Sequence, residues 1–292
     1  MMRKFAKKIL QPVWSRIEDR IEDRIEKKLN SIAKQIPMIL VCDFLRAEEF
    51  LDLLAPMSMK DHSLIRVGPN YDGGYIMVND KLDNNVVYNF GIGEEVNWDL
   101  GLTMRGSTIF QYDHTIEKPP LTNNNMRFFK LGLSPILCDD KKMKTIEELL
   151  IENGHENKTD MILNIDIEGG EWDVLSSISP DILSRFYQII IEYHFLYSIV
   201  NKEIGEKYIR ALKNINKSHQ VVHVHGNNYG PNAILNNFTY LPTYIEVTYV
   251  KKTGINFEIC DEIFPRSIDK PNKPGTYDYA LGPIGLTWKK QK

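Results

Sequence analysis

The stretch MILNIDIEGGEWD, residues 161–173, decides the fold of this chain. Five residues typical of a β-strand run directly into Asp166, and Glu168, Gly169 and Gly170 follow at once. Carboxylates are rarely buried without a partner, and adjacent glycines cost backbone entropy unless a sharp turn or a close backbone approach requires them. We therefore expect this corner to lie at the open edge of a sheet, where it faces a ligand.

Strand-like and helix-like segments alternate on both sides of this corner. Predicted strands cover residues 86–90, 108–112, 127–131, 161–165, 188–193, 220–224 and 244–250, and predicted helices cover 96–104, 145–153, 171–177, 181–186 and 202–215. Such alternation is typical of parallel strands joined by crossover helices, whereas the Gly-, Asn- and Pro-rich connection before the last strand favours an antiparallel pair at one edge. The sequence therefore predicts an α/β fold with a Rossmann-like, doubly wound, seven-stranded sheet whose seventh strand is antiparallel.

Three further segments flank or precede this core. Residues 1–36 are predicted as an amphipathic helix with a stripe of isoleucines. Three interpretations of this helix stay open: docking on the body of the protein, a coiled coil in a homo-oligomer, or peripheral contact with a membrane. Residues 37–85 are predicted as a helical cap, 86–253 as the cofactor-binding catalytic domain, and 254–292 as an extended, proline-containing tail.

The composition excludes several classes of protein. A net charge of −3 provides no bulk attraction to nucleic acid. Cys42, Cys138 and Cys260 are odd in number and widely spaced, which argues against a disulfide framework or a zinc knuckle and fits a reducing compartment. The sequence has no run of about 18 apolar residues and no secretory signal. We therefore expect a cytoplasmic protein without a transmembrane segment.

A glycine-containing turn follows the first predicted sheet strand. Residues 86–90 lead into Gly91, Ile92, Gly93 and Glu94, a turn that allows a ligand to approach backbone N–H groups, although a plain strand–helix turn would look the same. A dinucleotide fingerprint would need a small residue at position 96, where Val96 stands. This difference argues against a nicotinamide cofactor bound in the usual way.

The ends of the second and third strands offer further cofactor contacts. Asp113 lies 22 residues after Gly91, the separation expected for an acid that binds both ribose hydroxyls, although an N-cap or a solvated acid is the alternative. Leu133 and Ser134 close the third strand, where the base of a nucleoside would lie. Together with the predicted sheet, these residues favour a nucleoside cofactor.

Four motifs now suggest a family. DGGY (72–75), FGIGEE (90–95), FQYD (110–113) and NIDIEGGEWDVL (164–175) resemble the FkbM-like SAM-dependent methyltransferases and their methyltransferase-like relatives with a DGGY segment. The resemblance covers about residues 62–250, and Gly170 stands where many members have Ala. It implies a class I methyltransferase fold, S-adenosyl-L-methionine (SAM) as the methyl donor, and an oxygen acceptor on a sugar, glycan or secondary metabolite.

Imidazoles and carboxylates gather at the predicted strand ends, where doubly wound sheets bind their ligands. Methyl transfer to a hydroxyl needs a group that removes its proton, so we predict His194 or His225 as general base, oriented by Asp166. An alternative is Mg²⁺ or Mn²⁺ held by Asp166, His194 and either His225 or Glu192, which would lower the pKa of the hydroxyl.

The remaining predicted contacts lie in the cap and at the strand ends. Arg66, Asp72 and Gly73 are predicted on the cofactor side, with Arg66 at the carboxylate of SAM; the predicted acceptor contacts are Tyr75, Glu168, Asn227, Asn228 and Tyr229. The function favoured is O-methyl transfer to a sugar or glycan. Two alternatives are a non-catalytic scaffold that assembles through its N-terminal helix and a nucleotide-sugar transferase, whose DxD motif does not fit the spacing of the acids here.

Overall fold

The structure is a computed structural model that describes residues 38–236 and 239–282. The chain divides into Met1–Met38 and Ile39–Lys292, and the description below concerns the second unit. The predicted helix at residues 1–36 lies outside the described residues.

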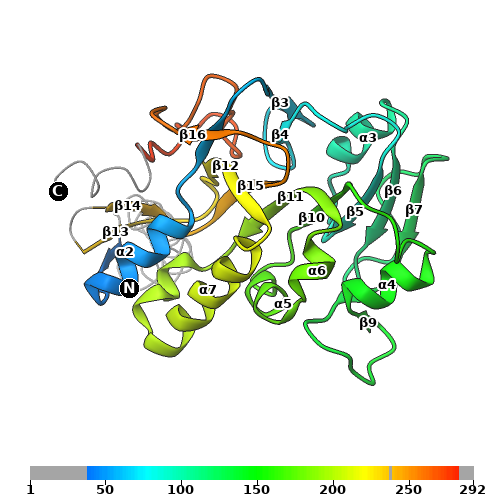
Figure 1. The fold of residues 1–292 in the computed structure, drawn as a ribbon, viewed down its shortest axis with the longest axis horizontal. Helices are drawn as coiled ribbons and strands as arrows, with labels where there is room; N and C mark the ends of the chain where they lie inside the picture. The colour runs from blue at the N-terminus through cyan, green and yellow to red at the C-terminus, as the bar shows by residue number, and fades with distance from the viewer. Residues whose placement is uncertain (1–37, 237–238, 283–292) are drawn as a thin grey trace, which may run out of the picture. The chain divides into compact units, whose positions relative to one another are not determined.

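A seven-stranded sheet forms the centre of this unit (Figure 1). Its order is β12 (His219–Gly226), β15 (Ile245–Lys251), β11 (Phe186–Tyr193), β10 (Met161–Ile165), β5 (Val86–Phe90), β6 (Thr108–Tyr112) and β7 (Met126–Phe129). The pairs among β11, β10, β5, β6 and β7 are parallel, whereas β15 runs antiparallel to both β11 and β12. The predicted seven-stranded sheet with its antiparallel seventh strand is thereby confirmed, and β15 is inserted beside the edge strand.

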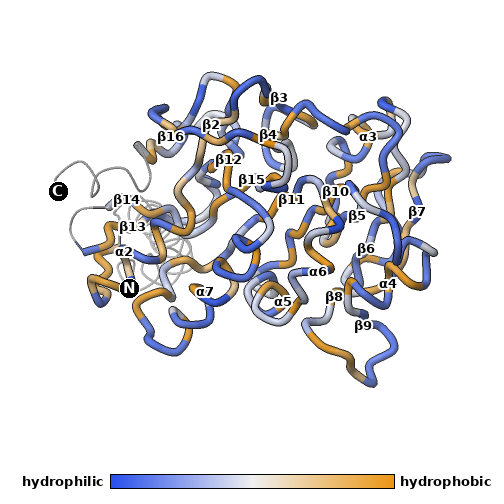
Figure 2. The backbone as a smooth tube through the Cα atoms, viewed as in Figure 1, coloured by the Kyte–Doolittle hydropathy of each residue, from blue (hydrophilic) through white to orange (hydrophobic). Residues whose placement is uncertain are grey.

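Apolar side chains of the central strands point alternately to the two faces of the sheet, as the two-residue period of a strand requires. Tyr88 and Leu163 belong to the larger apolar core, whereas Val87 and Ile162 belong to a second core on the other face. Figure 2 shows that β10 is largely hydrophobic and that many connecting loops are hydrophilic. Both faces of the sheet are therefore covered, which leaves the strand ends as the place for a site.

Helices cover the two faces of the sheet. They are α2 (Phe44–Leu53), α3 (Asn97–Thr103), α4 (Ile146–Glu152), α5 (Glu171–Ser177), α6 (Pro180–Leu183), the 3-10 helix η1 (Leu196–Val200) and α7 (Lys202–Ile215). Helix α4 begins with a capping box: the Thr145 side chain accepts the Glu148 N–H, and the Glu148 side chain accepts the Thr145 N–H. Helix α7 packs against both α5 and α2. No helix of the described residues is long and apolar enough to cross a membrane.

The lead-in segment 37–85 differs from the predicted helical cap. It contains one helix, α2, and the strands β1 (Met38–Leu40), β2 (Met57–Met59), β3 (Leu64–Val67) and β4 (Tyr75–Val78). Strands β3 and β4 pair as an antiparallel hairpin whose connection carries the first three residues of the DGGY motif, and Tyr75 of the motif begins β4. All four residues of β4 are buried, which explains why an apolar run here forms a strand.

The remaining strands are short and lie outside the central sheet. They are β8 (Gly132–Leu133), β9 (Met143–Lys144), β13 (Asn232–Leu235), β14 (Thr239–Pro242) and β16 (Phe257–Ile259). Strand β16 pairs with β2, and the C-terminal segment that follows buries Asp269 and Asn272. The predicted extended tail is thus fixed to the body of the protein at several points.

Candidate active site

The turns after β5 and β10 touch each other through their backbones. The Asp166 N–H donates to the Phe90 carbonyl over 3.0 Å, and the Gly91 N–H donates to the Tyr112 carbonyl over 2.9 Å. A Cβ at Gly91 would lie 1.6 Å from the Asp166 carbonyl oxygen, and its φ is +82°. Gly93, with φ +50°, has nothing within 4 Å of the corresponding position. Gly91 therefore permits contact between chain segments, whereas Gly93 borders open space.

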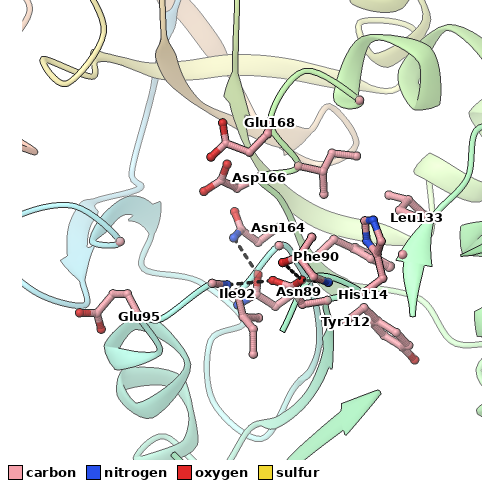
Figure 3. Close-up of a pocket in the computed structure, with 18 of the residues that line it drawn as sticks. Asn89, Phe90, Ile92, Glu95, Tyr112, His114, Leu133, Asn164, Asp166 and Glu168 are labelled. Atoms are coloured by element: carbon pink, nitrogen blue, oxygen red, sulfur yellow. Dashed lines mark hydrogen bonds between the residues drawn. The ribbon is translucent and has the colours of Figure 1, made fainter. Parts of the chain in front are cut away.

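A cavity of about 520 Å³ opens above these turns, a volume typical of small-ligand sites. Ten of the predicted residues line it: Asp72, Gly73, Tyr75, Gly91, Gly93, Glu94, Asp113, Leu133, Asp166 and Glu168. In Figure 3, Asp166 and Glu168 lie next to each other at one end of the cavity, and His114 and Leu133 lie on the other side. One cavity thus connects the glycine-containing turn with the carboxylates after β10.

Asp113 is held by the turn that it faces. One carboxylate oxygen accepts the Gly93 N–H over 3.0 Å, and the other accepts the Thr115 N–H over 2.8 Å and the Thr115 hydroxyl over 2.6 Å. Burial alone would raise the pKa of Asp113, but the hydrogen bonds from Thr115 and Gly93 outweigh it and lower the pKa. The carboxylate is therefore ionised, and its remaining lone-pair site can accept a hydroxyl of a ribose.

A buried polar network that the sequence analysis missed lies beneath the cavity. Asp99 accepts hydrogen bonds of 2.8 Å from the side-chain amides of Asn89 and Gln111, and Asn164 donates to Asn89 over 2.9 Å. Burial raises the pKa of Asp99 to about 7, against the opposing effect of these hydrogen bonds. The side-chain amide oxygen of Asn164 is buried without a hydrogen-bond partner among the described residues. This network fixes the amide of Asn164 at the cavity wall (Figure 3).

The corner after β10 packs against the corner after β11. Glu168 and Phe195 have left-handed backbones, with φ of +55° and +59°, and Gly169 between them in space has φ +105°. A Cβ at Gly169 would lie 2.7 Å from the Phe195 ring. Non-glycine residues rarely adopt this conformation unless the surroundings impose it. The two corners therefore hold Glu168 beside His194, with 3.4 Å between the Glu168 carboxylate and Nε2 of His194.

His194 is oriented by Glu171, not by the predicted Asp166. The Glu171 carboxylate, fully buried, accepts the His194 backbone N–H over 2.7 Å and lies 3.0 Å from Nδ1. Its other oxygen accepts the Gly169 N–H over 2.8 Å. Burial alone would lower the pKa of His194, but the hydrogen bond and charge of Glu171, with the charge of Asp166, outweigh it and raise the pKa. The predicted order of the two residues is also wrong: Asp166, predicted to support His194, lines the cavity itself, and His194 lies behind Asp166, 3.8 Å away.

His225 does not fit either role predicted for it. Its Nδ1 lies 3.1 Å from Glu246 and its Nε2 lies 3.0 Å from Asp278, and the side chain is almost fully buried. Burial opposes protonation, but the hydrogen bonds with Asp278 and Glu246 raise the pKa of His225 to about 10. An imidazolium with both nitrogens bound to carboxylates cannot accept a substrate proton or bind a metal. His225 instead joins the C-terminal segment to the sheet.

Two residues predicted on the cofactor side do not line the cavity. Arg66 donates to the Pro69 carbonyl over 2.8 Å and to the Tyr71 carbonyl over 3.0 Å, so it supports the loop before the DGGY motif. The hydroxyl of Ser134 donates to the carbonyl of residue 136 over 2.6 Å. Both side chains therefore shape loops around the cavity.

The predicted acceptor loop after β12 is mostly used for internal contacts. The Asn227 amide donates to Glu192 over 2.7 Å and to Asp72 over 3.3 Å. The Asn228 amide donates to the Tyr277 carbonyl over 3.0 Å, which ties this loop to the C-terminal segment. Tyr229 is 55% exposed and does not line the cavity.

Carboxylates form two adjoining groups that reach from the cavity wall into the protein. Asp166, Glu192 and His194 can bring one ligand atom each within 4.8 Å of one another, and so can Asp72, Glu192 and Glu246. Burial, and next the charge of Asp166, raises the pKa of Glu192. Burial also raises the pKa of Asp72, against a hydrogen bond of 2.9 Å from Asn272. The predicted His225 belongs to neither group.

Comparisons with known proteins support one family. The family model described as "Methyltransferase FkbM domain" matches residues 69–230, more than half of the chain. Comparison with curated proteins returned no match.

Comparison with solved structures returned similar chains at low identity. The chain is similar to a "putative S-adenosylmethionine dependent methyltransferase" from Listeria monocytogenes, with 10% identity over 59% of this chain and 91% of that chain and a TM-score of 0.34. It is also similar to the fibrillarin pre-rRNA processing protein of Methanococcus jannaschii, with 8% identity over 68% of this chain and 88% of that chain and a TM-score of 0.34. A third similar structure is Aeropyrum pernix fibrillarin with natively bound S-adenosyl-L-methionine, with 10% identity over 68% of this chain and 86% of that chain and a TM-score of 0.33. The family assignment therefore rests on the sequence match.

Proposed function

Since this chain belongs to the FkbM family of SAM-dependent methyltransferases, we propose that it transfers the methyl group of SAM to a hydroxyl oxygen of a sugar, glycan precursor or related small molecule. The observation that carries the proposal is the single cavity that runs from Gly93 and Asp113 to Asp166 and Glu168. Polar side chains at both ends provide for the ribose of the donor and for a polyhydroxylated acceptor.

The reaction needs a donor and a proton acceptor at the two ends of this cavity. SAM supplies a methyl group on a sulfonium, and the sulfur leaves as a neutral thioether when the new C–O bond forms. Asp113 and the Gly93 turn bind the nucleoside end, and Asp166 takes the hydroxyl proton because it lines the cavity. His194, which Glu171 orients, lies 3.8 Å from Asp166 on the side away from the cavity.

A comparison of ligands tests the proposal. A ligand at a hundredfold excess over its Kd should raise the free energy of unfolding by about 2.7 kcal/mol, so SAM and S-adenosylhomocysteine should raise the melting temperature, whereas NAD and a nucleotide sugar should not. Release of S-adenosylhomocysteine in the presence of sugar acceptors should then fall at least a hundredfold in Asp166→Asn. The exposed Asp173→Asn is the matched control.

Each competing function has its own outcome in these measurements. Stabilisation by a nucleotide sugar but by neither SAM nor its product would replace methyl transfer with glycosyl transfer. Stabilisation by none of the four ligands would favour the non-catalytic scaffold. The cytoplasmic location and the homo-oligomer stay predictions. The divalent cation stays a prediction too, and of its two predicted third ligands Glu192 lies beside Asp166 and His194, whereas His225 does not.

A further inference from the structure

Nε2 of His194 faces carboxylates without a hydrogen bond among the described residues. His194 is 3% exposed, and Nε2 makes no hydrogen bond with any described residue. It lies 3.4 Å from Glu168, 3.7 Å from Glu192 and 3.8 Å from Asp166. The Asp166 carboxylate likewise accepts no hydrogen bond from the part of the chain that the structure describes. The imidazole of His194 and the carboxylates of Asp166 and Glu192 thus surround one point without a hydrogen bond among the three, an arrangement that a ligand bound between them would satisfy.

We propose that Asp166, Glu192 and His194 bind one divalent cation of the Mg²⁺ or Mn²⁺ type. Such ions bind oxygen and imidazole nitrogen at about 2.0–2.3 Å, which places neighbouring ligand atoms about 3 Å apart and opposite ones about 4.5 Å apart. The separations of 3.7 and 3.8 Å from Nε2 lie between these limits. Small side-chain rotations therefore suffice to form the site.

Glu171 completes the arrangement behind the imidazole. Metal-bound histidines usually donate their second N–H to a carboxylate or carbonyl, which fixes the tautomer and the ring orientation. Glu171 lies 3.0 Å from Nδ1 and also accepts the His194 backbone N–H. This hydrogen bond keeps a proton on Nδ1, so that Nε2 is the nitrogen that would bind a cation lying between Asp166 and Glu192.

The neighbouring charges favour a cation at this point. Asp72 and Glu246 approach Glu192 from the other side, and Asn227 donates a hydrogen bond to Glu192 over 2.7 Å. A charge of +2 would offset several buried carboxylates that otherwise repel one another. Two carboxylates and one imidazole leave further coordination positions, and Asp166 opens these to the cavity.

The site would deepen the proposed function, on which this role rests. An acceptor hydroxyl bound to the cation beside Asp166 would lose its proton more readily. Asp166 would then act as ligand, and Glu168, the other carboxylate at this end of the cavity, would take the proton. Cation binding itself requires neither SAM nor methyl transfer, so it can be tested independently of the reaction.

Mn²⁺ titration of the full chain after treatment with a chelator tests the site. Loss of the electron paramagnetic resonance signal of free Mn²⁺ should report one ion per chain. Pulsed measurements should show coupling to an imidazole nitrogen on the unaltered protein. Glu192→Gln and His194→Gln should each weaken binding at least tenfold, and His194→Gln should abolish the nitrogen coupling. Asp173→Asn should leave both unchanged, and circular dichroism should show that the variants are folded.

Three results would overturn the proposal. The first is the absence of binding at millimolar Mn²⁺. The second is binding without nitrogen coupling. The third is binding that Asp72→Asn removes and His194→Gln retains, which would place the ion in the neighbouring acidic group. Failure of a variant to fold leaves the stoichiometry and the nitrogen coupling of the unaltered protein to decide. Methyl transfer in the complete absence of bound cation would remove only the catalytic role of the ion.

Discussion

Gly91 and Gly93 lie two residues apart in one turn, and we expect the same substitution to have different effects at the two positions. A Cβ at Gly91 would lie 1.6 Å from the Asp166 carbonyl oxygen, so the turn would have to move by about 1.4 Å to reach the 3.0 Å that real contacts show. Such a shift would break the hydrogen bond between the Asp166 N–H and the Phe90 carbonyl. A Cβ at Gly93 meets nothing within 4 Å.

The two substitutions therefore differ in their energetic cost. Both positions have positive φ, and a left-handed backbone costs a residue with a Cβ about 1–2 kcal/mol. Gly93→Ala should lose only that amount of unfolding free energy. Gly91→Ala should lose more than about 4 kcal/mol, because steric overlap and lost backbone hydrogen bonds add to the strain. A loss of that size is a large fraction of the stability of a typical domain.

Urea denaturation and cofactor titration measure the two effects separately. Gly93→Ala should remain folded but bind S-adenosylhomocysteine at least about tenfold more weakly, equivalent to about 1.4 kcal/mol, because its methyl group projects into the cavity. Gly91→Ala should be largely unfolded or expressed at low yield. Equal stability of the two variants would refute the close approach of the two turns, and unchanged affinity in Gly93→Ala would remove the cofactor from this end of the cavity.

Three further predictions concern buried ionisable groups. The pKa of Asp99 is raised to about 7 from about 3.9 in an unfolded chain, so its contribution to stability is present below pH 4 and is lost as the pH rises through 7. Asp99→Asn should therefore stabilise the protein increasingly between pH 4 and 7, by up to about 4 kcal/mol. An effect on urea denaturation that does not depend on pH would contradict this. The pKa of His225 is raised to about 10, so the stability that its protonation provides is present below pH 6.5 and is lost as the pH rises through 10. Asp278→Asn should lower the free energy of unfolding by about 1.5–3 kcal/mol at pH 7 and by less at pH 10.5. Equal losses at both pH values would argue against an imidazolium. Glu171→Gln should destabilise the protein by about 1–3 kcal/mol, because a Gln amide cannot accept all three N–H groups that Glu171 faces, those of the Gly169 backbone, the His194 backbone and the His194 ring. It should also slow methyl transfer at least tenfold. Asp173→Asn on the same helix should have neither effect in the same assays.

The sequence predicted the central strands well because their patterns are local. The bounds of β5, β6 and β10 agree with the predicted ranges, since each is a short apolar run closed by Gly or Asp. Asp113 and Asp166 follow these strands directly, so their place at the cavity could be inferred from strand order alone. The helical cap was wrong because the apolar residues of β4 pair with β3 and pack on the sheet, which are long-range contacts.

The roles of individual side chains were harder to predict. His225 looked like a free imidazole because its partner Asp278 comes 53 residues later, in a tail without a regular pattern. Glu171 has no role among the predicted site residues, although it lies in the first turn of α5 and bonds His194. The buried polar network does have a signal in the sequence. Asn89 and Asn164 carry amides inside otherwise apolar strands, and buried amides require hydrogen-bond partners.

The insertion of β15 between β11 and β12 has a practical consequence for anyone who cuts or fuses this protein. The family match ends at residue 230, whereas β15 begins at Ile245. An excised piece ending with the match would keep β11, all eight residues of which are buried, and would lose the strand that covers its edge. Unpaired backbone groups beside apolar side chains would recruit other copies of the fragment, so such a truncation should precipitate while the longer chain stays dispersed.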